Sequence, residues 1–178
     1  RSILSLGVCG LRDRALAAER AAKEEKACEF YRAAARVFEA MRCYIVRLAE
    51  LAEKRGAAIV APVLRALSER PPQSFHEALQ LAYLYHEVQE IEGELVRSMG
   101  CFDRLYIDFY RRDIASGALT REEAKELLKF FWIKFYAKTQ GLQAGKNFCF
   151  GGLLPDGSDA VNELTVLAYE TYRELRVV

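Results

Sequence analysis

The stretch that decides the fold reads ERPPQSFHEALQLAYLYHEVQEIEGELVRSMGCFDRLYIDFYRRDIASGALTREEAKELLKFFWIKF over residues 69–135, and it continues as KNFCFGG over residues 146–152. It holds two capping boxes, Ser74–Glu77 and Thr120–Glu123, in which the side chain at each end can bond the backbone N–H at the other end. Apolar residues recur at helical spacing after each box. Each box therefore predicts the start of a helix.

The sequence on either side of these boxes is also mostly helical in pattern. Helical spacing predicts a long amphipathic helix from about Ala15 to Arg55, which Gly56 ends, and a shorter helix around Ile59–Leu67. One strand is expected at Asn147–Leu154, before the turn at 155–157. The other predicted helices are Phe102–Ala115 and a last helix from Ala160 to about Leu175, which Asp159 is placed to cap.

The segment 89–100 interrupts the helical pattern. It carries Glu90, Glu92, Glu94 and Arg97 among apolar neighbours. Because an unpaired charge beside a core costs several kcal/mol on an order-of-magnitude scale, such charges are either paired or used. The segment is therefore a candidate site, and the alternative is an ordinary surface loop whose charges are solvated.

Composition narrows the classes of partner and compartment. The chain has 178 residues, of which 26 are basic and 25 acidic, and their interspersed signs predict no binding to nucleic acid or to an anionic membrane. No apolar run reaches the roughly 18 residues of a membrane span, and no signal-peptide pattern opens the chain. We therefore expect a cytoplasmic protein. The cysteines lack metal-site spacing and are expected to be free thiols: Cys9, Cys28, Cys43, Cys101 and Cys149.

Three motifs in a fixed order resemble the pyruvate formate-lyase domain of glycyl radical enzymes. They are RPPQSFHEALQL at 70–81, the run that begins SMGCFDRLYIDFY at residue 98, and NFCFGGLLPDGSDAVNELTVLAYE at 147–170. The resemblance implies a mostly α fold, namely the helical part of a pyruvate formate-lyase-like α/β barrel with one or two barrel strands present. It also implies that 1–178 is a partial domain, with outer scaffold helices at 1–70 and the family core at 71–178.

The resemblance further implies a radical lyase or dehydratase, in which a glycyl radical generates a cysteine thiyl that abstracts hydrogen from a small organic substrate. Neither the cysteine loop nor the radical glycine loop of that family is recognisable here, and Cys101 stands where the family usually has Arg. We therefore assign no catalytic, cofactor-binding or metal-binding residue and expect the chain to be an inactive N-terminal-half fragment. The alternative is a non-catalytic helical interaction module derived from such an enzyme.

The same resemblance implies the partners of the whole enzyme and the residues of its substrate pocket. The partners are the rest of the barrel, a radical-SAM iron–sulfur activating enzyme, the small-molecule substrate and, at full length, a second subunit of a homodimer. The family's pattern places two apolar residues, Leu95 and Val96, in the pocket. Their apolar character argues against a glycerol-type dehydratase, which needs hydrogen-bonding groups at these positions. Because successive side chains of the strand point to opposite faces, the face toward the substrate carries either Asn147 and Cys149 or Phe148 and Phe150. The pocket candidates are Glu94, Leu95, Val96, Arg97, Asn147 and Phe148.

Overall fold

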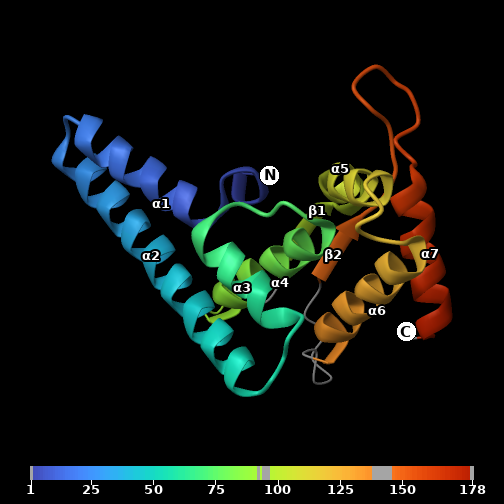
Figure 1. Ribbon diagram of the computed structural model, residues 1–178. Coiled ribbons are helices and arrows are strands. Elements are labelled where there is room, and N and C mark those ends of the chain that lie inside the picture. The colour runs from blue at the N-terminus through green and yellow to red at the C-terminus, as the bar shows by residue number, and fades with distance from the viewer. Residues whose placement is uncertain (1, 92, 94–96, 138–145, 177–178) are drawn as a thin grey trace. The chain divides into compact units, whose positions relative to one another are not determined.

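The structure is a computed structural model that describes residues 2–91, 93, 97–137 and 146–176 (Figure 1). None of the helices in these ranges is both long and apolar enough to cross a bilayer. The elements in chain order are α1 (Ser2–Ala21), α2 (Glu25–Lys54), α3 (Val60–Glu69), α4 (Phe75–Ile91), β1 (Arg97–Cys101), α5 (Phe102–Ala115), α6 (Arg121–Ala137), β2 (Lys146–Cys149) and α7 (Glu163–Leu175).

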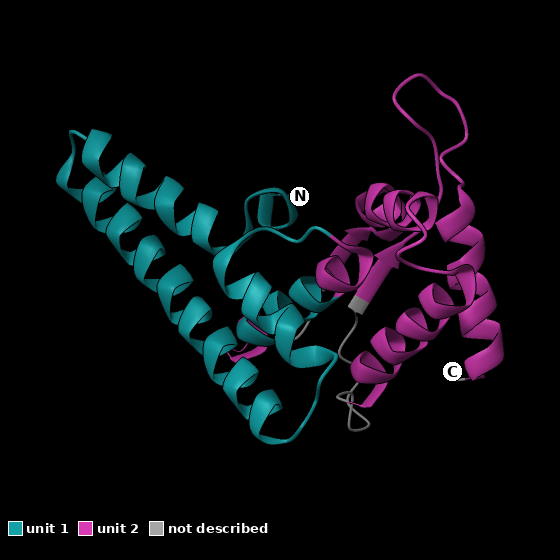
Figure 2. Cartoon of the chain, in the orientation of Figure 1, with its two compact units in different colours: residues 1–73, 80–88 teal, residues 74–79, 89–178 magenta. Residues whose placement is uncertain are grey.

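The chain divides into two compact units (Figure 2). Unit 1 comprises residues 1–73 and 80–88, and unit 2 comprises residues 74–79 and 89–178. Residues of α4 therefore belong to both units. The predicted division into scaffold helices and family core at residues 70 and 71 stays a prediction.

Unit 1 is built on a hairpin of α1 and α2, which lie side by side (Figure 1). The prediction of one helix from Ala15 to Arg55 is wrong, because the chain reverses at residues 22–24. The reversal lets the apolar stripes of both helices face one core, which a single continuous helix could not do. The buried residues of this core are Val8, Met41, Ile45, Ala49, Leu64, Leu67, Leu81 and Leu84.

Gly7 makes a corner inside α1. Its φ of 65° and ψ of −176° interrupt the helix and belong to a region that is open almost only to glycine. A Cβ atom at this position would lie 2.9 Å from both Cα and N of Pro71. The corner therefore depends on a residue without a side chain for two separate reasons, the backbone angles and the closeness of the segment after α3.

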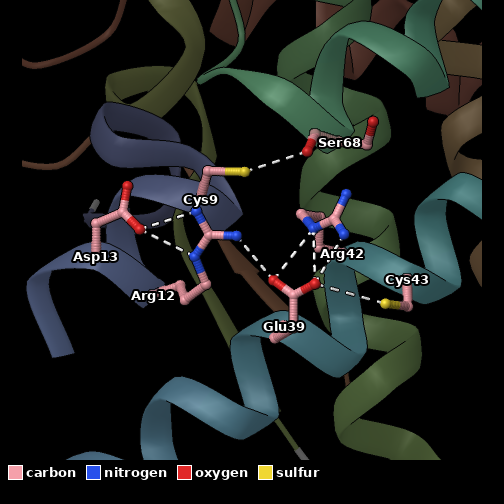
Figure 3. Close-up of polar contacts among 7 residues, drawn as sticks. All are labelled: Cys9, Arg12, Asp13, Glu39, Arg42, Cys43 and Ser68. Atoms are coloured by element: carbon pink, nitrogen blue, oxygen red, sulfur yellow. Dashed lines mark hydrogen bonds and ion pairs between the residues drawn. The ribbon is translucent and has the colours of Figure 1, made fainter. Parts of the chain in front are cut away.

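Ion pairs brace the hairpin (Figure 3). The Glu39 carboxylate of α2 lies between two guanidinium groups, at 2.7 Å from Nη2 of Arg42 and 2.8 Å from Nη1 of Arg12 in α1. Arg32 and Glu19 form a further α2–α1 pair at 2.7 Å, nearer the turn. Hydrogen bonds from Arg42 and then Arg12 hold the pKa of Glu39 at about 2, below its usual value of 4.5.

Unit 2 contains a two-stranded parallel sheet of β1 and β2, with α5 and α6 between the strands in sequence. The residue pattern of 89–100 did not predict β1, which has no alternating apolar positions and forms by pairing with β2. A bulge inserts one extra residue in β1, and Gly100, with a φ of 76°, lies within it. The register pairs Arg97 with Lys146, Ser98 with Asn147, and Cys101 with Cys149.

The strand predicted at Asn147–Leu154 is shorter than expected, because β2 ends at Cys149. Gly151 and Gly152 follow with φ values of 59° and 86°, which turn the chain out of the extended conformation. Leu153 then makes only an isolated antiparallel bridge with Asp159. The sequence between β2 and α7 is thus a loop rather than a continuation of the strand.

Helices α5, α6 and α7 cover one face of the sheet through aromatic side chains. The ring centroid of Phe148 in β2 lies 5.0 Å from that of Trp132 and 5.5 Å from that of Phe135, both in α6. Phe150 lies 5.6 Å from Tyr169 of α7. Aromatic pairs at such separations stabilise a core beyond the area they bury, so this face is the interior of unit 2.

The start of α7 differs from the prediction. Asn162, and not Asp159, is the N-cap: its side-chain oxygen accepts from the N–H groups of Leu164 at 3.0 Å and Thr165 at 3.3 Å. The Thr165 hydroxyl in turn accepts from the Asn162 N–H at 3.0 Å, which completes a capping box. Asp159 instead accepts from the Val161 N–H in the preceding turn.

The starts of α4 and α6 agree with the sequence. At the Thr120 box, the Glu123 carboxylate accepts from the Thr120 N–H at 2.8 Å and the Glu123 N–H donates to the Thr120 hydroxyl at 3.2 Å. At the Ser74 box, the Glu77 N–H donates to the Ser74 hydroxyl at 3.1 Å. The prediction of helices after both boxes is therefore confirmed.

We predict that Gly7→Ala destabilises unit 1 by about 2 kcal/mol or more, since it adds a clash with the Pro71 backbone to the strain of the backbone angles. Gly56→Ala is the matched control: its φ is 67° but a Cβ there meets nothing within 4 Å, so it should cost about 1 kcal/mol. Urea unfolding followed by far-UV circular dichroism measures both. An equal loss of stability in the two variants would contradict a close contact between residue 7 and the Pro71 backbone.

A second prediction concerns acid. Because the pKa of Glu39 is lowered in the folded chain, its ion pairs stabilise fully above about pH 4.5 and lose this effect as the pH falls through about 2. Glu39→Gln should cost under about 1 kcal/mol at pH 7, as expected for exposed pairs. Between pH 4.5 and 2, the free energy of unfolding of the Glu39→Gln variant should also fall less steeply than that of the unaltered chain. The control Glu50→Gln, an exposed change on the same helix, should alter the free energy of unfolding at pH 7 by under about 0.5 kcal/mol.

Candidate functional site

The face of the sheet opposite the aromatic side chains carries short polar groups. Because successive side chains of a strand point to opposite faces, Asn147 and Cys149 lie on the other side from Phe148. Register neighbours share a face, so Ser98 lies beside Asn147, and Cys101 beside Cys149. Asn147, Cys149 and Ser98 are exposed, and Cys101 is half-buried. These four residues are called the polar face of the sheet.

The bulge in β1 positions the two residues that this strand contributes. The Ser98 hydroxyl accepts from the Gly100 N–H at 3.3 Å, across the bulge. The extra residue returns Cys101 to register with β2 immediately before α5 begins. Arg104, in the first turn of α5, donates from Nη2 to Cys101 Sγ at 2.7 Å. The polar face thus combines an amide, a hydroxyl and two thiols, with one guanidinium at its edge.

Asp103 fixes this arrangement from within the core. Its side chain is fully buried, and Oδ2 accepts from the Gly151 N–H at 2.6 Å and from the Thr165 hydroxyl. Oδ1 accepts from the Arg104 N–H at 2.9 Å. One carboxylate therefore holds together the first turn of α5, the end of the β2 segment and the first turn of α7.

Asp103 stands in the quoted motif next to the core residue Phe102, but the residue pattern around it predicts no role for it. Asp103 is an acidic residue in the first turn of a helix. The helix dipole favours such a residue in exposed helices too, so the local pattern does not indicate that it is buried. The signal that could have identified it is its position directly after the apolar Phe102, at a helix end that must enter the core.

A second buried acid secures the other end of α5. The Asp113 carboxylate accepts from the Phe75 N–H at 2.6 Å, which satisfies one of the unpaired N–H groups at the start of α4. Asp113 is only 7% exposed. The two buried carboxylates of α5 therefore both serve as acceptors for backbone groups, and neither belongs to the polar face.

The structure brings only some of the predicted pocket residues together. Three of them, Glu94, Leu95 and Val96, lie outside the described residues. Arg97 opens β1, with its backbone opposite that of Lys146 in β2. The predicted segment and the predicted strand therefore lie side by side where the structure describes them.

The remaining two candidates lie on opposite faces. Asn147 belongs to the polar face, whereas Phe148 is half-buried among the aromatic side chains of α6. The amide of Asn147 can both donate to and accept from a small polar ligand. Within the described ranges, no three His, Cys, Asp or Glu side chains gather as they would around a metal ion.

We predict that Asp103→Asn lowers the free energy of unfolding by about 2 kcal/mol and Asp103→Ala by about 4 kcal/mol, because buried donors on Gly151 and Thr165 lose their acceptor. The unfolding transition in urea can be followed by the fluorescence of Trp132. This residue is the single tryptophan of the chain, lies in unit 2 and is 4% exposed. The control Asp108→Asn, exposed on the same helix, should stay within about 0.5 kcal/mol of the unaltered chain. A similarly small effect at Asp103 would remove it as the residue that fixes the site.

The family of the chain follows from its similarity to known proteins. The whole chain, residues 1–178, matches the family model described as pyruvate formate lyase-like. The 4-hydroxyphenylacetate decarboxylase glycyl radical subunit of Clostridioides difficile (strain 630) is 30% identical over 170 residues, which cover 83% of this chain and 19% of that protein. The isethionate sulfite-lyase of Oleidesulfovibrio alaskensis is 30% identical over 164 residues, which cover 78% of this chain and 20% of that protein. The chain thus spans about a fifth of the length of these curated relatives.

Solved structures show the same fold. The crystal structure of a glycyl radical enzyme from Archaeoglobus fulgidus superposes with a TM-score of 0.84 at 29% identity, over 96% of this chain and 26% of that chain. The B12-independent glycerol dehydratase from Clostridium butyricum gives a TM-score of 0.85 at 22% identity, over 99% and 26% of the two chains, and here the likeness concerns the fold alone. The described helices and parallel strand pair are therefore part of a barrel of this type. The chain belongs to the pyruvate formate lyase-like family of glycyl radical enzymes.

Proposed function

We propose that the chain forms part of the wall of the substrate pocket in a glycyl radical lyase or dehydratase. Such an enzyme cleaves a C–C or C–heteroatom bond of a small organic substrate after a thiyl radical has removed a hydrogen atom from it. The names of the relatives include a decarboxylase, a dehydratase and a sulfite-lyase. The proposal therefore covers the reaction class that these names share and leaves the individual substrate open.

The observation that carries the proposal is the two-sided sheet. Phe148 points to the face that helices cover, and Asn147 points to the face with exposed polar side chains. In an α/β barrel the helices surround the strands, so the face away from the helices lines the interior. The polar face is on this argument the side that meets a ligand.

Individual residues receive roles within this wall. Asn147 and Ser98 supply hydrogen bonds to an oxygen-bearing group of the substrate, and Phe148 supports the strand by packing. The segment that leads into β1 belongs to the same wall, and its apolar pair disfavours a glycerol-type dehydratase. The residues of that segment are Glu94, Leu95, Val96 and Arg97.

In this proposal the chain by itself is inactive. The rest of the barrel supplies the thiyl cysteine and the radical glycine, and a radical-SAM iron–sulfur activating enzyme installs the radical. The full-length protein is then a cytoplasmic homodimer that works without oxygen. The family membership supports these partners, and the relatives' greater length leaves room for the missing elements.

The test uses the full-length protein that contains these residues, activated without oxygen and assayed with small hydroxylated, carboxylated and sulfonated compounds. For a compound that is turned over, Asn147→Ala should lower kcat/KM by about tenfold, since one hydrogen bond to the reacting substrate is worth on the order of 1.4 kcal/mol. The glycyl radical signal in electron paramagnetic resonance should keep its intensity. Asp108→Asn, on the exposed side of α5, should change neither quantity.

The two possible failures are distinguishable. If the unaltered full-length protein never acquires a glycyl radical, the lyase function is wrong and the non-catalytic helical module replaces it. If the radical forms and Asn147→Ala keeps the original kcat/KM, the lyase function stands but the polar face is not the pocket wall.

A further inference from the structure

Two of the five cysteines are direct neighbours on adjacent strands. Cys101 ends β1 and Cys149 ends β2, and the register pairs their Cα atoms. Without the bulge at Gly100 the two strands would keep their earlier register, and Cys149 would instead face the glycine. The bulge is therefore what places the two thiols opposite each other.

The spacing of the strands suits a bond between these thiols. Neighbouring strands lie about 4.7–4.9 Å apart, and disulfides join Cα atoms that are about 4.4–6.8 Å apart. Both side chains leave the same face of the sheet, Cys149 is exposed and Cys101 is half-buried. The Arg104 guanidinium donates to Cys101 Sγ at 2.7 Å, an exposed contact at the end of β1.

The other cysteines have different surroundings. Cys9 donates from Sγ to the Ser68 carbonyl oxygen at 3.1 Å, and burial raises the pKa of its thiol. Cys43 Sγ lies 3.7 Å from Glu39 Oε1 (Figure 3). Cys28 donates to backbone carbonyl groups of its own hairpin. These three thiols belong to unit 1 and provide internal comparisons for the pair in unit 2.

We propose that Cys101 and Cys149 form a dithiol site that hydrogen peroxide, or another peroxide, oxidises reversibly to a disulfide. The site follows from the strand register and does not depend on the proposed function. In its oxidised form it would tie β1 to β2 at the bulge and remove both thiols from the polar face.

The chemistry of the step balances with the peroxide alone. The more exposed sulfur, that of Cys149, attacks one peroxide oxygen, so that an S–O bond forms, the O–O bond breaks and the departing hydroxide takes a proton and leaves as water. The Cys101 sulfur then attacks the resulting sulfenic sulfur; an S–S bond forms, the S–O bond breaks and a second water carries away the thiol proton. The two thiols lose two electrons and the peroxide gains them.

The test treats the reduced chain with one equivalent of hydrogen peroxide, blocks remaining thiols and maps tryptic peptides without reduction. We expect a cross-linked product of the peptides 98–104 and 147–173, lighter by two hydrogens than their sum and at least about tenfold more abundant than any other cysteine pair. Dithiothreitol should separate the two peptides again. Cys28→Ser with Cys43→Ser should leave this product unchanged, and Cys149→Ser should abolish it.

The same treatment in urea shows whether the pairing comes from the fold. In an unfolded chain the loop from Cys28 to Cys43 is about three times shorter than that from Cys101 to Cys149, so closure should favour the first pair about sixfold. Dominance of the Cys101–Cys149 product in the native chain and its loss in urea would support the proposal. Separate alkylation of both cysteines in the native chain, or the same pair distribution in both conditions, would overturn it.

Discussion

Unit 2 depends on one buried carboxylate. Asp103 lies at the start of α5 and accepts hydrogen bonds from Arg104, from Gly151 after β2 and from Thr165 in α7. Each buried donor left without an acceptor would cost about 1–3 kcal/mol, so the three segments are stable only in the arrangement that surrounds this side chain. This constraint fixes the end of the β2 segment relative to α5 and α7, while alternation along β2 separates its aromatic and polar faces.

The sequence predicts those parts of the fold that depend on nearby residues. The boxes at Ser74 and Thr120 start α4 and α6, because the bonds that define such a box join residues three apart. The break between α1 and α2 was missed, since no glycine or proline marks it and only the packing of two apolar stripes requires it. Likewise, Asn162 rather than Asp159 caps α7 because Thr165, which completes the box, is also bonded to the buried Asp103.

The candidate site could be predicted only in part. Alternation along β2 indicates that Asn147 and Phe148 lie on different faces, but the choice between the faces depends on the helices that cover one of them. Strand β1 has no pattern of its own, and its pairing with a strand that follows two helices is not visible from local spacing. The resemblance of the motifs to a known family identified this region, and the structure adds that Ser98 and the two cysteines share the face of Asn147.

In the proposed function, the polar face of the β1–β2 sheet meets the substrate. The most direct test is a crystal structure of the full-length protein with its substrate or a close analogue bound. We expect a side-chain atom of Asn147 or Ser98 within about 3.5 Å of a polar atom of the ligand, with Phe148 still packed on α6. A ligand that contacts neither residue, or that reaches the sheet from the side of Phe148, would contradict it.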